Sequence, residues 1–164
     1  MRITIAAVGR LKAGPERELF ARYAERIASA GRPVGIAGLN LYEIDESRAR
    51  RAEDRRAEEA QLLARFGSGD AFVALDERGR DVTSEDFAVW LRARRDAATE
   101  VTFLIGGPDG LDPKLMAPPA TRFRFGAMTL PHGLVRVLLA EQIYRAVTIL
   151  VGHPYHRGSM HRDD

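Results

Sequence analysis

Two short apolar runs place the tightest constraint on the fold of this chain. Residues 71–75 (AFVAL) and 101–105 (VTFLI) contain no charged side chain. Such runs are typical of strands that are buried on both faces, as in a parallel sheet covered by helices. The second run leads directly into a glycine-rich segment, GGPDG, at residues 106–110. Because ligands of open α/β sheets bind where the strands end, this segment is a candidate ligand loop.

The remaining segments alternate between strand and helix patterns. Further strands are predicted at residues 2–8, 34–44 and 122–125, a turn at 77–81, and helices at 15–30, 47–66, 84–97 and 134–151. The first helix should bury Leu19, Phe20, Tyr23 and Ile27, which recur at helical spacing. Thr83 or Ser84 should cap the third helix. This alternation predicts an α/β fold with a mainly parallel sheet flanked by helices, in one domain over residues 1–164.

Composition excludes several classes of function. The chain has no cysteine, which removes disulfides, thiolate nucleophiles and cysteine-based zinc sites. Its net charge of +2 gives no strong overall field that would attract nucleic acid. No apolar run reaches the ~18 residues that a membrane span needs, and the first residues do not have the pattern of a signal peptide. We therefore expect a cytoplasmic protein.

Two glycine-containing segments are candidates for binding a ligand. The segment 106–110 matches neither the G-x-G-x-x-G fingerprint nor a phosphate-binding GK[ST] loop, which disfavours dinucleotide and triphosphate chemistry. Residues 125–132 (FGAMTLPH) are mostly small or apolar, so backbone groups there could contact the edge of an adenine ring while apolar atoms pack on its faces. Taken alone, an ordinary strand-to-helix turn explains the second segment better.

Charged residues mark two of the predicted helices. In the helix at 47–66, five arginines alternate with acidic residues: Arg48, Arg50, Arg51, Arg55 and Arg56. A solvated face is favoured over an RNA-facing surface, because the acids cancel most of the field. In the last helix, Arg136, Glu141 and Arg145 interrupt a wide apolar stripe. That helix is either a core helix with a solvated edge or a helix at a dimer interface.

The C-terminal tail gathers polar side chains in the sequence GHPYHR, residues 152–157. His153, Tyr155, His156 and Arg157 combine hydrogen-bond donors, an aromatic ring and a cation, a set that can stack on a base and hold phosphate. A frayed chain end is the alternative. A metal site is not predicted, because the two histidines lack a third ligand.

Three motifs taken together are more specific than any one of them: LIGGPDGL at 104–111, MTLPHGLVRVLLAEQIYRA at 128–146 and HPYHR at 153–157. They closely resemble the bacterial methyltransferases of the SPOUT superfamily that modify N3 of a pseudouridine in 23S ribosomal RNA of the large subunit. The resemblance extends over nearly the whole chain, from ITIAAVG at residues 3–9. Residues 158–164 (GSMHRDD) depart from it, and we expect them to form a flexible tail.

The resemblance implies a fold, a cofactor and partners. The fold is of the SPOUT type, with a trefoil knot in its C-terminal part, and the cofactor is S-adenosylmethionine. The implied cofactor-binding residues are Leu75, Gly106, Phe125, Gly126, Ala127, Met128, Thr129 and Leu130. The helix after Pro131 would pack against a second subunit in a homodimer, and the tail would approach 23S rRNA within the ribosome.

The chemistry of the target restricts the catalytic candidates. N3 of pseudouridine carries a proton that must leave, so a base, or donors that stabilise the resulting anion, are required. His153 or His156 could be the base, and Arg157 could stabilise a carbonyl oxygen or hold phosphate; Tyr155 completes the group. No metal is needed. A non-catalytic ribosome-binding factor, a dinucleotide-dependent oxidoreductase and a different target nucleotide are the alternatives.

Overall fold

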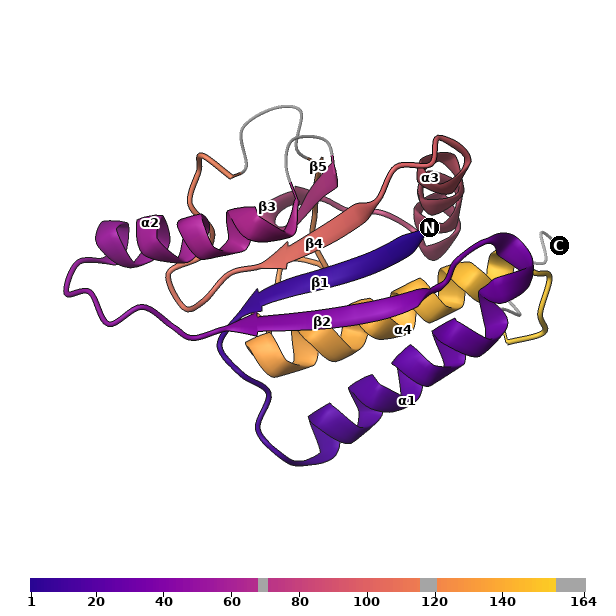
Figure 1. Cartoon of the computed structure of the whole chain (residues 1–164), viewed down its shortest axis with the longest axis horizontal. Coiled ribbons are helices and arrows are strands. Elements are labelled where there is room, and N and C mark those ends of the chain that lie inside the picture. The colour runs from indigo at the N-terminus through magenta and orange to yellow at the C-terminus, as the bar shows by residue number, and fades with distance from the viewer. Residues whose placement is uncertain (68–70, 116–120, 156–164) are drawn as a thin grey trace, which may run out of the picture.

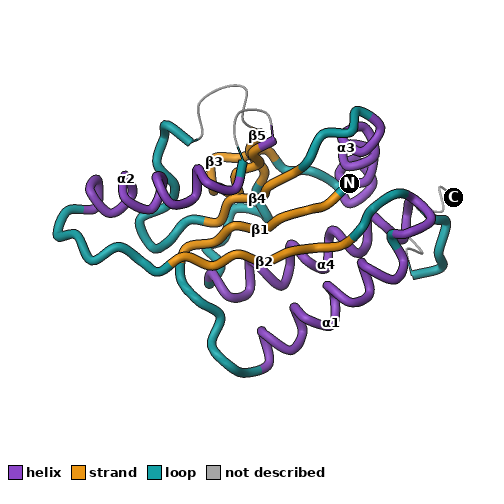
Figure 2. The backbone as a smooth tube through the Cα atoms, in the orientation of Figure 1, coloured by secondary structure: helices purple, strands orange, loops and turns teal. Residues whose placement is uncertain are grey.

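The computed structural model of the chain describes residues 1–67, 71–115 and 121–155 and contains one five-stranded parallel sheet (Figures 1 and 2). The strands are β1 (Arg2–Val8), β2 (Gly38–Ile44), β3 (Phe72–Arg80), β4 (Val101–Ile105) and β5 (Thr121–Phe123). Their order across the sheet is β2-β1-β4-β3-β5, and every neighbouring pair is parallel. The predicted α/β fold with a parallel sheet is therefore confirmed.

Helices cover both faces of the sheet. They are α1 (Pro15–Ala30), α2 (Ala52–Leu63), α3 (Ser84–Asp96) and α4 (His132–Leu150), with short 3-10 helices η1 (Arg32–Val34) and η2 (Ala64–Phe66). Figure 1 shows α1 and α4 side by side on one face and α2 on the other. Thr83 caps α3, as predicted, by accepting a hydrogen bond from the Asp86 amide at 3.1 Å. None of the described helices is both long and apolar enough to cross a membrane.

The core is divided by the sheet, because successive side chains of a strand point to opposite faces. In β1, Ile5 belongs to the larger cluster, which also contains the buried residues of α1, α3 and α4. Val8, on the other face, belongs to a smaller cluster with Leu63 of α2. The two apolar runs that the sequence analysis singled out form β4 and the buried half of β3.

The structure corrects two predicted boundaries and one predicted burial in the first half of the chain. The helix predicted at 47–66 begins only at Ala52, because the preceding backbone turns back on the helix: the Ser47 amide donates to Glu59 at 3.0 Å. The strand predicted at 34–44 begins at Gly38, since a 3-10 turn ending at Gly35 (φ 71°) precedes it. Leu19, predicted to be buried, is 37% exposed.

The predicted turn at 77–81 is wrong, because β3 continues to Arg80. Gly79 serves a close approach between strands instead: a Cβ at this position would lie 2.5 Å from the backbone of Phe123 in β5. β5 itself ends at Phe123, two residues before the predicted limit.

The parallel arrangement brings the carboxyl ends of the strands to one edge of the molecule. Leu75 of β3 is in register with Ile105 of β4, so the segments that follow them begin as neighbours. Helix α4 starts at this same edge and runs back along the sheet (Figure 1). Its 19 residues correspond to about 28 Å at the usual rise per residue, so its two ends lie far apart.

Candidate cofactor site

A cavity of about 450 Å³ opens at the carboxyl edge of the sheet. Its walls come from the middle of β3, from the segments that follow β4 and β5, from Arg56 of α2 and from the first turn of α4. All eight residues predicted to bind the cofactor line it: Leu75, Gly106, Phe125, Gly126, Ala127, Met128, Thr129 and Leu130. The structure thus brings together three segments that are separated by up to 55 positions in the sequence, counting from 75 to 130.

The wall after β4 is a tight glycine turn. The Gly110 amide donates to the Gly107 carbonyl at 3.0 Å, and the two residues form a short antiparallel bridge. Gly110 has a φ of 79°, which favours glycine. At Gly106 a Cβ would lie 2.7 Å from the Gly110 carbonyl carbon. The turn therefore requires glycine at both positions, and it presents backbone rather than side chains to the cavity.

The wall after β5 has backbone groups that are free to bind a ligand. Residues 125–130 have no regular secondary structure, and no backbone hydrogen bond joins them to another residue in the part of the chain that the structure describes. Open space surrounds Gly126 (φ 102°) and Gly110: apart from their chain neighbours, no described atom lies within 4 Å of the position that a Cβ would take at either residue. Because backbone polar groups are normally paired, a ligand with matching donors and acceptors suits this wall.

S-adenosylmethionine fits this cavity in size and chemistry. The volume lies within the range of small-molecule sites, about 300–1,000 Å³. Leu75, Phe125 and Val135 supply apolar surface for the faces of an adenine ring. The backbone of residues 125–130, which forms no backbone hydrogen bond with another described residue, can hydrogen bond to its edge. The glycine turn at 106–110 is not a phosphate-binding GK[ST] loop, so these features fit an adenosine group better than a polyphosphate.

Charged side chains surround the cavity, and the sequence analysis did not select most of them. Arg124 is paired with Asp81 at 2.6 Å, and this pairing lowers the pKa of the aspartate. Arg56 and Arg78 also line the cavity, and neither forms an ion pair with any described residue. Arg78 lies in the exposed second half of β3, three residues after the apolar run 71–75. Its position just beyond that run was the signal that could have identified it.

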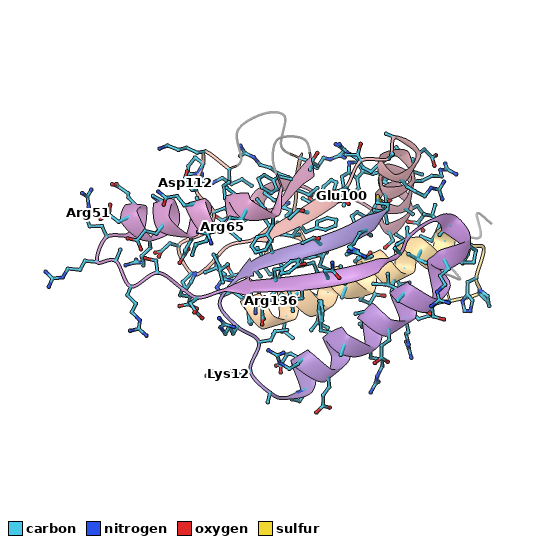
Figure 3. All side chains as sticks on the ribbon, in the orientation of Figure 1. Lys12, Arg51, Arg65, Glu100, Asp112 and Arg136 are labelled. Carbon is cyan, nitrogen blue, oxygen red and sulfur yellow. The ribbon has the colours of Figure 1, made fainter. Side chains whose placement is uncertain are left out.

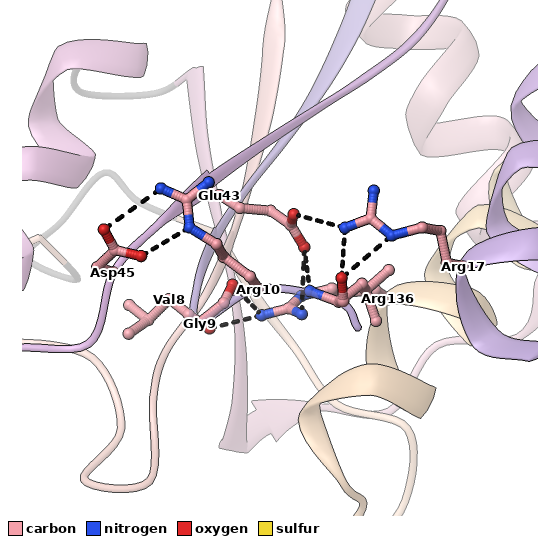
Figure 4. A network of polar contacts seen from close by, with 8 residues as sticks. Val8, Gly9, Arg10, Arg17, Glu43, Asp45 and Arg136 are labelled. Carbon is pink, nitrogen blue, oxygen red and sulfur yellow. Dashed lines mark hydrogen bonds and ion pairs between the residues drawn. The ribbon is translucent and has the colours of Figure 1, made fainter. Parts of the chain in front are cut away.

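Arg136 connects the start of α4 to the ends of β1 and β2, as Figure 4 shows by its contacts with Val8, Gly9 and Glu43. Its side chain is only 2% exposed, and Nη2 donates to the carbonyls of Val8 at 2.5 Å and Gly9 at 2.9 Å. Nη1 lies 3.5 Å from Oε1 of Glu43. Burial lowers the pKa of this guanidinium, and Glu43 opposes the shift. The expectation of a solvated edge is wrong for Arg136, because the carbonyls at the end of β1 need a buried donor.

Figure 3 shows the contrast between two arginines. Arg136 of α4 extends toward β2, whereas Arg51, directly before the first residue of α2, projects outward. Arg51 pairs with Glu53, and both side chains are 70% exposed. The interpretation of the α2 arginines as a solvated face therefore holds for Arg51, whereas Arg55 and Arg56 lie closer to the cavity.

The described part of the tail does not line the cavity. The amide of His153 donates to Thr148 at 2.9 Å, at the far end of α4. Nδ1 of His153 accepts a hydrogen bond from the Tyr155 amide at 3.1 Å, so this nitrogen's lone pair is engaged. His156, Arg157 and residues 158–164 lie outside the described residues. No three acidic or histidine side chains among the described residues are placed to hold a metal ion.

Tyr155 is held against α4. Its hydroxyl lies 3.2 Å from Oε1 of Glu141, and its ring packs at 4.8 Å from that of Tyr144. The guanidinium of Arg145, itself paired with Glu141 as the sequence indicated, lies over the ring at 5.1 Å. Burial, with hydrogen bonding to Tyr23, raises the pKa of Tyr155 to about 12. The phenol therefore stays protonated at neutral pH.

Comparisons with known proteins identify the family. The family described as "Predicted SPOUT methyltransferase" matches residues 1–156. A protein of Xanthobacter autotrophicus named "Ribosomal RNA large subunit methyltransferase H" is 56% identical over 159 residues, 96% of this chain and 99% of the relative. Proteins of the same name from Methylobacterium radiotolerans (57% over 161 residues, 96% and 98%) and Rhodopseudomonas palustris (54% over 159 residues, 96% and 99%) are similar to it along the same length. This chain, with its cavity at the carboxyl edge of a parallel sheet, belongs to the SPOUT methyltransferase family.

Proposed function

We propose that this protein transfers a methyl group from S-adenosylmethionine to N3 of a pseudouridine in 23S rRNA of the large ribosomal subunit, in the cytoplasm. The observation that carries the proposal is the convergence of eight residues from three segments on one cavity, where the backbone of residues 125–130 forms no backbone hydrogen bond with another described residue. Membership of the family supports methyl transfer, and the name of the similar proteins supports large-subunit rRNA as the substrate. The target atom follows from the resemblance of the three motifs.

The chain's own residues bind and orient the two reactants. Bound S-adenosylmethionine supplies an electrophilic methyl group on a sulfonium. The glycine turn at 106–110 and the backbone of residues 125–130 would hold its adenosine part, with Leu75 packed on the ring. Methyl transfer is an in-line displacement, so holding cofactor and base in alignment provides much of the rate.

A second requirement is removal of the proton from N3. Tyr155 is an unsuitable base near neutral pH, because its pKa is about 12. His153 already accepts a hydrogen bond at Nδ1, which leaves His156 as the better candidate. Arg56 and Arg78 line the cavity and form no ion pair with a described residue. Together with Arg157, they would stabilise the anion that forms or hold nearby phosphates.

The geometry favours an active site shared between two subunits. His153 follows the end of α4, whereas His132 at its start lines the cavity, so about 28 Å of helix separates them in one chain. Leu134 and Leu138 of α4 are 43% and 39% exposed, and Leu19 of α1 is 37% exposed. We propose a homodimer that covers these residues and brings the tail of one subunit to the cavity of the other. A trefoil knot around the cofactor is part of the same proposal.

The test uses methyl-labelled S-adenosylmethionine and RNA from cells that lack the modification. Assembled ribosomes, isolated large subunits and naked 23S rRNA are offered separately, and the labelled nucleotide is identified. We expect label at N3 of one pseudouridine, with assembled ribosomes the best substrate. Cofactor binding without label on any of these RNAs would refute the substrate, and absence of cofactor binding would refute the assignment of the cavity.

Mixed dimers test the shared site. One subunit carries Gly126→Leu, which blocks its cavity, and the other lacks residues 153–164. Each parent dimer should be inactive, and the mixture should regain about a quarter to a half of wild-type activity, since one of the two sites is intact in a mixed dimer. A mixture with no activity, although mixed dimers form, would contradict the exchange of tails.

A further inference from the structure

The glycine turn at the cavity is held by an ion pair that the proposed mechanism does not use, and one partner of the pair, Asp109, also lines the cavity. Asp109 lies inside the turn, and Arg55 of α2 reaches it with two parallel hydrogen bonds. Nε donates to Oδ2 at 2.6 Å and Nη2 donates to Oδ1 at 3.0 Å. Both side chains are largely shielded, with exposures of 29% and 24%. The pair lowers the pKa of Asp109, so the carboxylate stays charged and paired.

The same guanidinium also holds the chain that leads into α2. Nη1 of Arg55 donates to the carbonyls of Ala49 and Arg50, both at 3.0 Å. All three guanidinium nitrogens are therefore engaged, and one side chain links α2, the segment before it and the glycine turn. A planar guanidinium can form this set of bonds, whereas a lysine ammonium cannot reproduce the two parallel bonds to one carboxylate.

A buried carboxylate completes the packing behind the turn. Glu59, one helical turn after Arg55, is only 4% exposed and accepts a hydrogen bond from the Ser47 amide at 3.0 Å. A Cβ at Gly107 would lie 3.0 Å from Cγ1 of Val8 and 3.5 Å from Oε2 of Glu59. The turn thus has the cavity on one side and closely packed atoms on the other, and it has little room to shift.

We propose that the Arg55–Asp109 pair is a positioning device that fixes the turn at 107–110 in the conformation that binds the cofactor. The inference rests on the proposed function of the cavity. Without the pair, the turn keeps one backbone hydrogen bond across it, from the Gly110 amide to the Gly107 carbonyl, and becomes free to move into the cavity. Cofactor binding then has to order the turn, and its affinity falls.

The first experiment measures the affinity for S-adenosylmethionine by calorimetry with Arg55→Ala, Asp109→Asn and the double variant. We expect each single variant to raise Kd about tenfold, the loss typical of hydrogen bonds to a charged group, and the double variant to be no worse than either. Arg55→Lys should recover only part of the affinity. In turnover, KM for the cofactor should rise while kcat stays close to wild type.

Arg51→Ala is the matched control, because Arg51 lies one helical turn from Arg55 and its ion pair with Glu53 is exposed. It should bind the cofactor as wild type does. If Asp109→Asn weakens binding and Arg55→Ala does not, Asp109 contacts the cofactor itself, and the positioning role is refuted.

A second measurement does not depend on the cofactor. Hydrogen exchange of the Gly110 amide in the free protein should be about tenfold faster in Arg55→Ala than in wild type, and unchanged in Arg51→Ala. Unchanged exchange would overturn the inference. Failure of the wild-type protein to bind the cofactor would refute the proposed function instead, and the exchange result would still decide whether the pair holds the turn.

Discussion

Replacement of Arg136 by methionine is expected to destabilise the whole domain. Methionine is similarly long and unbranched, so it fills much of the same space without a donor. The change removes the bonds from Nη2 to the carbonyls of Val8 and Gly9 and the contact of 3.5 Å between Nη1 and Glu43. Those two carbonyls lie at the end of β1 and contact the side chain of Arg136 near the start of α4.

The size of the effect follows from two opposing contributions. Each hydrogen bond from a charged donor is worth about 1.5–3 kcal/mol, which gives about 3–6 kcal/mol for the two carbonyls. Against this, the variant no longer buries a cation whose Nε atom has no partner in the described structure. Glu43 keeps its bond from the Leu11 amide at 2.6 Å. We therefore expect a net loss of about 3 kcal/mol, at the lower end of the values for a broken buried pair.

Urea unfolding measures this loss, with wild type and variant at the same protein concentration so that self-association would affect both equally. The slope with denaturant should stay constant, and Tm should fall by about 6–12 °C for a domain of this size. Arg10→Met is the control, because the Arg10–Asp45 pair is exposed (63% and 77%) and should contribute nothing measurable. A variant at Arg136 that is as stable as wild type would refute the argument that the strand end requires this donor.

Three further perturbations have defined outcomes. Gly126→Ala and Gly35→Ala both place a side chain at positive φ, so each should lower stability by about 1–2 kcal/mol. Only Gly126→Ala should also weaken cofactor binding, measured by calorimetry. Equal cofactor affinities of the two variants would contradict the cavity assignment. Burial raises the pKa of Glu59 above 4.5, so the contribution of Glu59 to stability should be fully present below that pH and be lost as pH rises through the raised pKa. The difference in stability between wild type and Glu59→Gln, measured by urea unfolding across this range, should therefore change with pH; parallel pH profiles of the two proteins would contradict it. Tyr155 should ionise only near pH 12, so its contribution to stability should be lost between about pH 10 and 12. In an ultraviolet titration, Tyr155→Phe should remove the tyrosine transition near pH 12. An unchanged transition at that pH would contradict this assignment.

Local patterns in the sequence were sufficient for the elements and for the fold class. The apolar runs that became β3 and β4 and the cap at Thr83 depend on residues close together in the chain, and hydrophobic periodicity reports such local burial directly. Seven of the eight predicted cofactor-binding residues lie in the two glycine-containing segments that the sequence analysis selected, 106–110 and 125–132, and Leu75 was added by the resemblance. Their assignment to one site came from the resemblance, because each segment alone fitted an ordinary turn.

The tertiary structure decided everything that depends on contacts between distant segments. The sequence predicted that Gly79 lies in a turn, whereas the structure packs it against Phe123 of β5. The sequence also indicated a solvated Arg136, whereas the structure buries this side chain against the carbonyls at the end of β1. The pairing of Arg55 with Asp109 joins positions 54 residues apart. The sequence alone determined which segments could form strands, helices and ligand loops. The order of the strands determined which of those segments meet. Hydrogen bonds and burial act between residues that are close in space, and the free energy of burying a polar group depends on neighbours that no local pattern specifies.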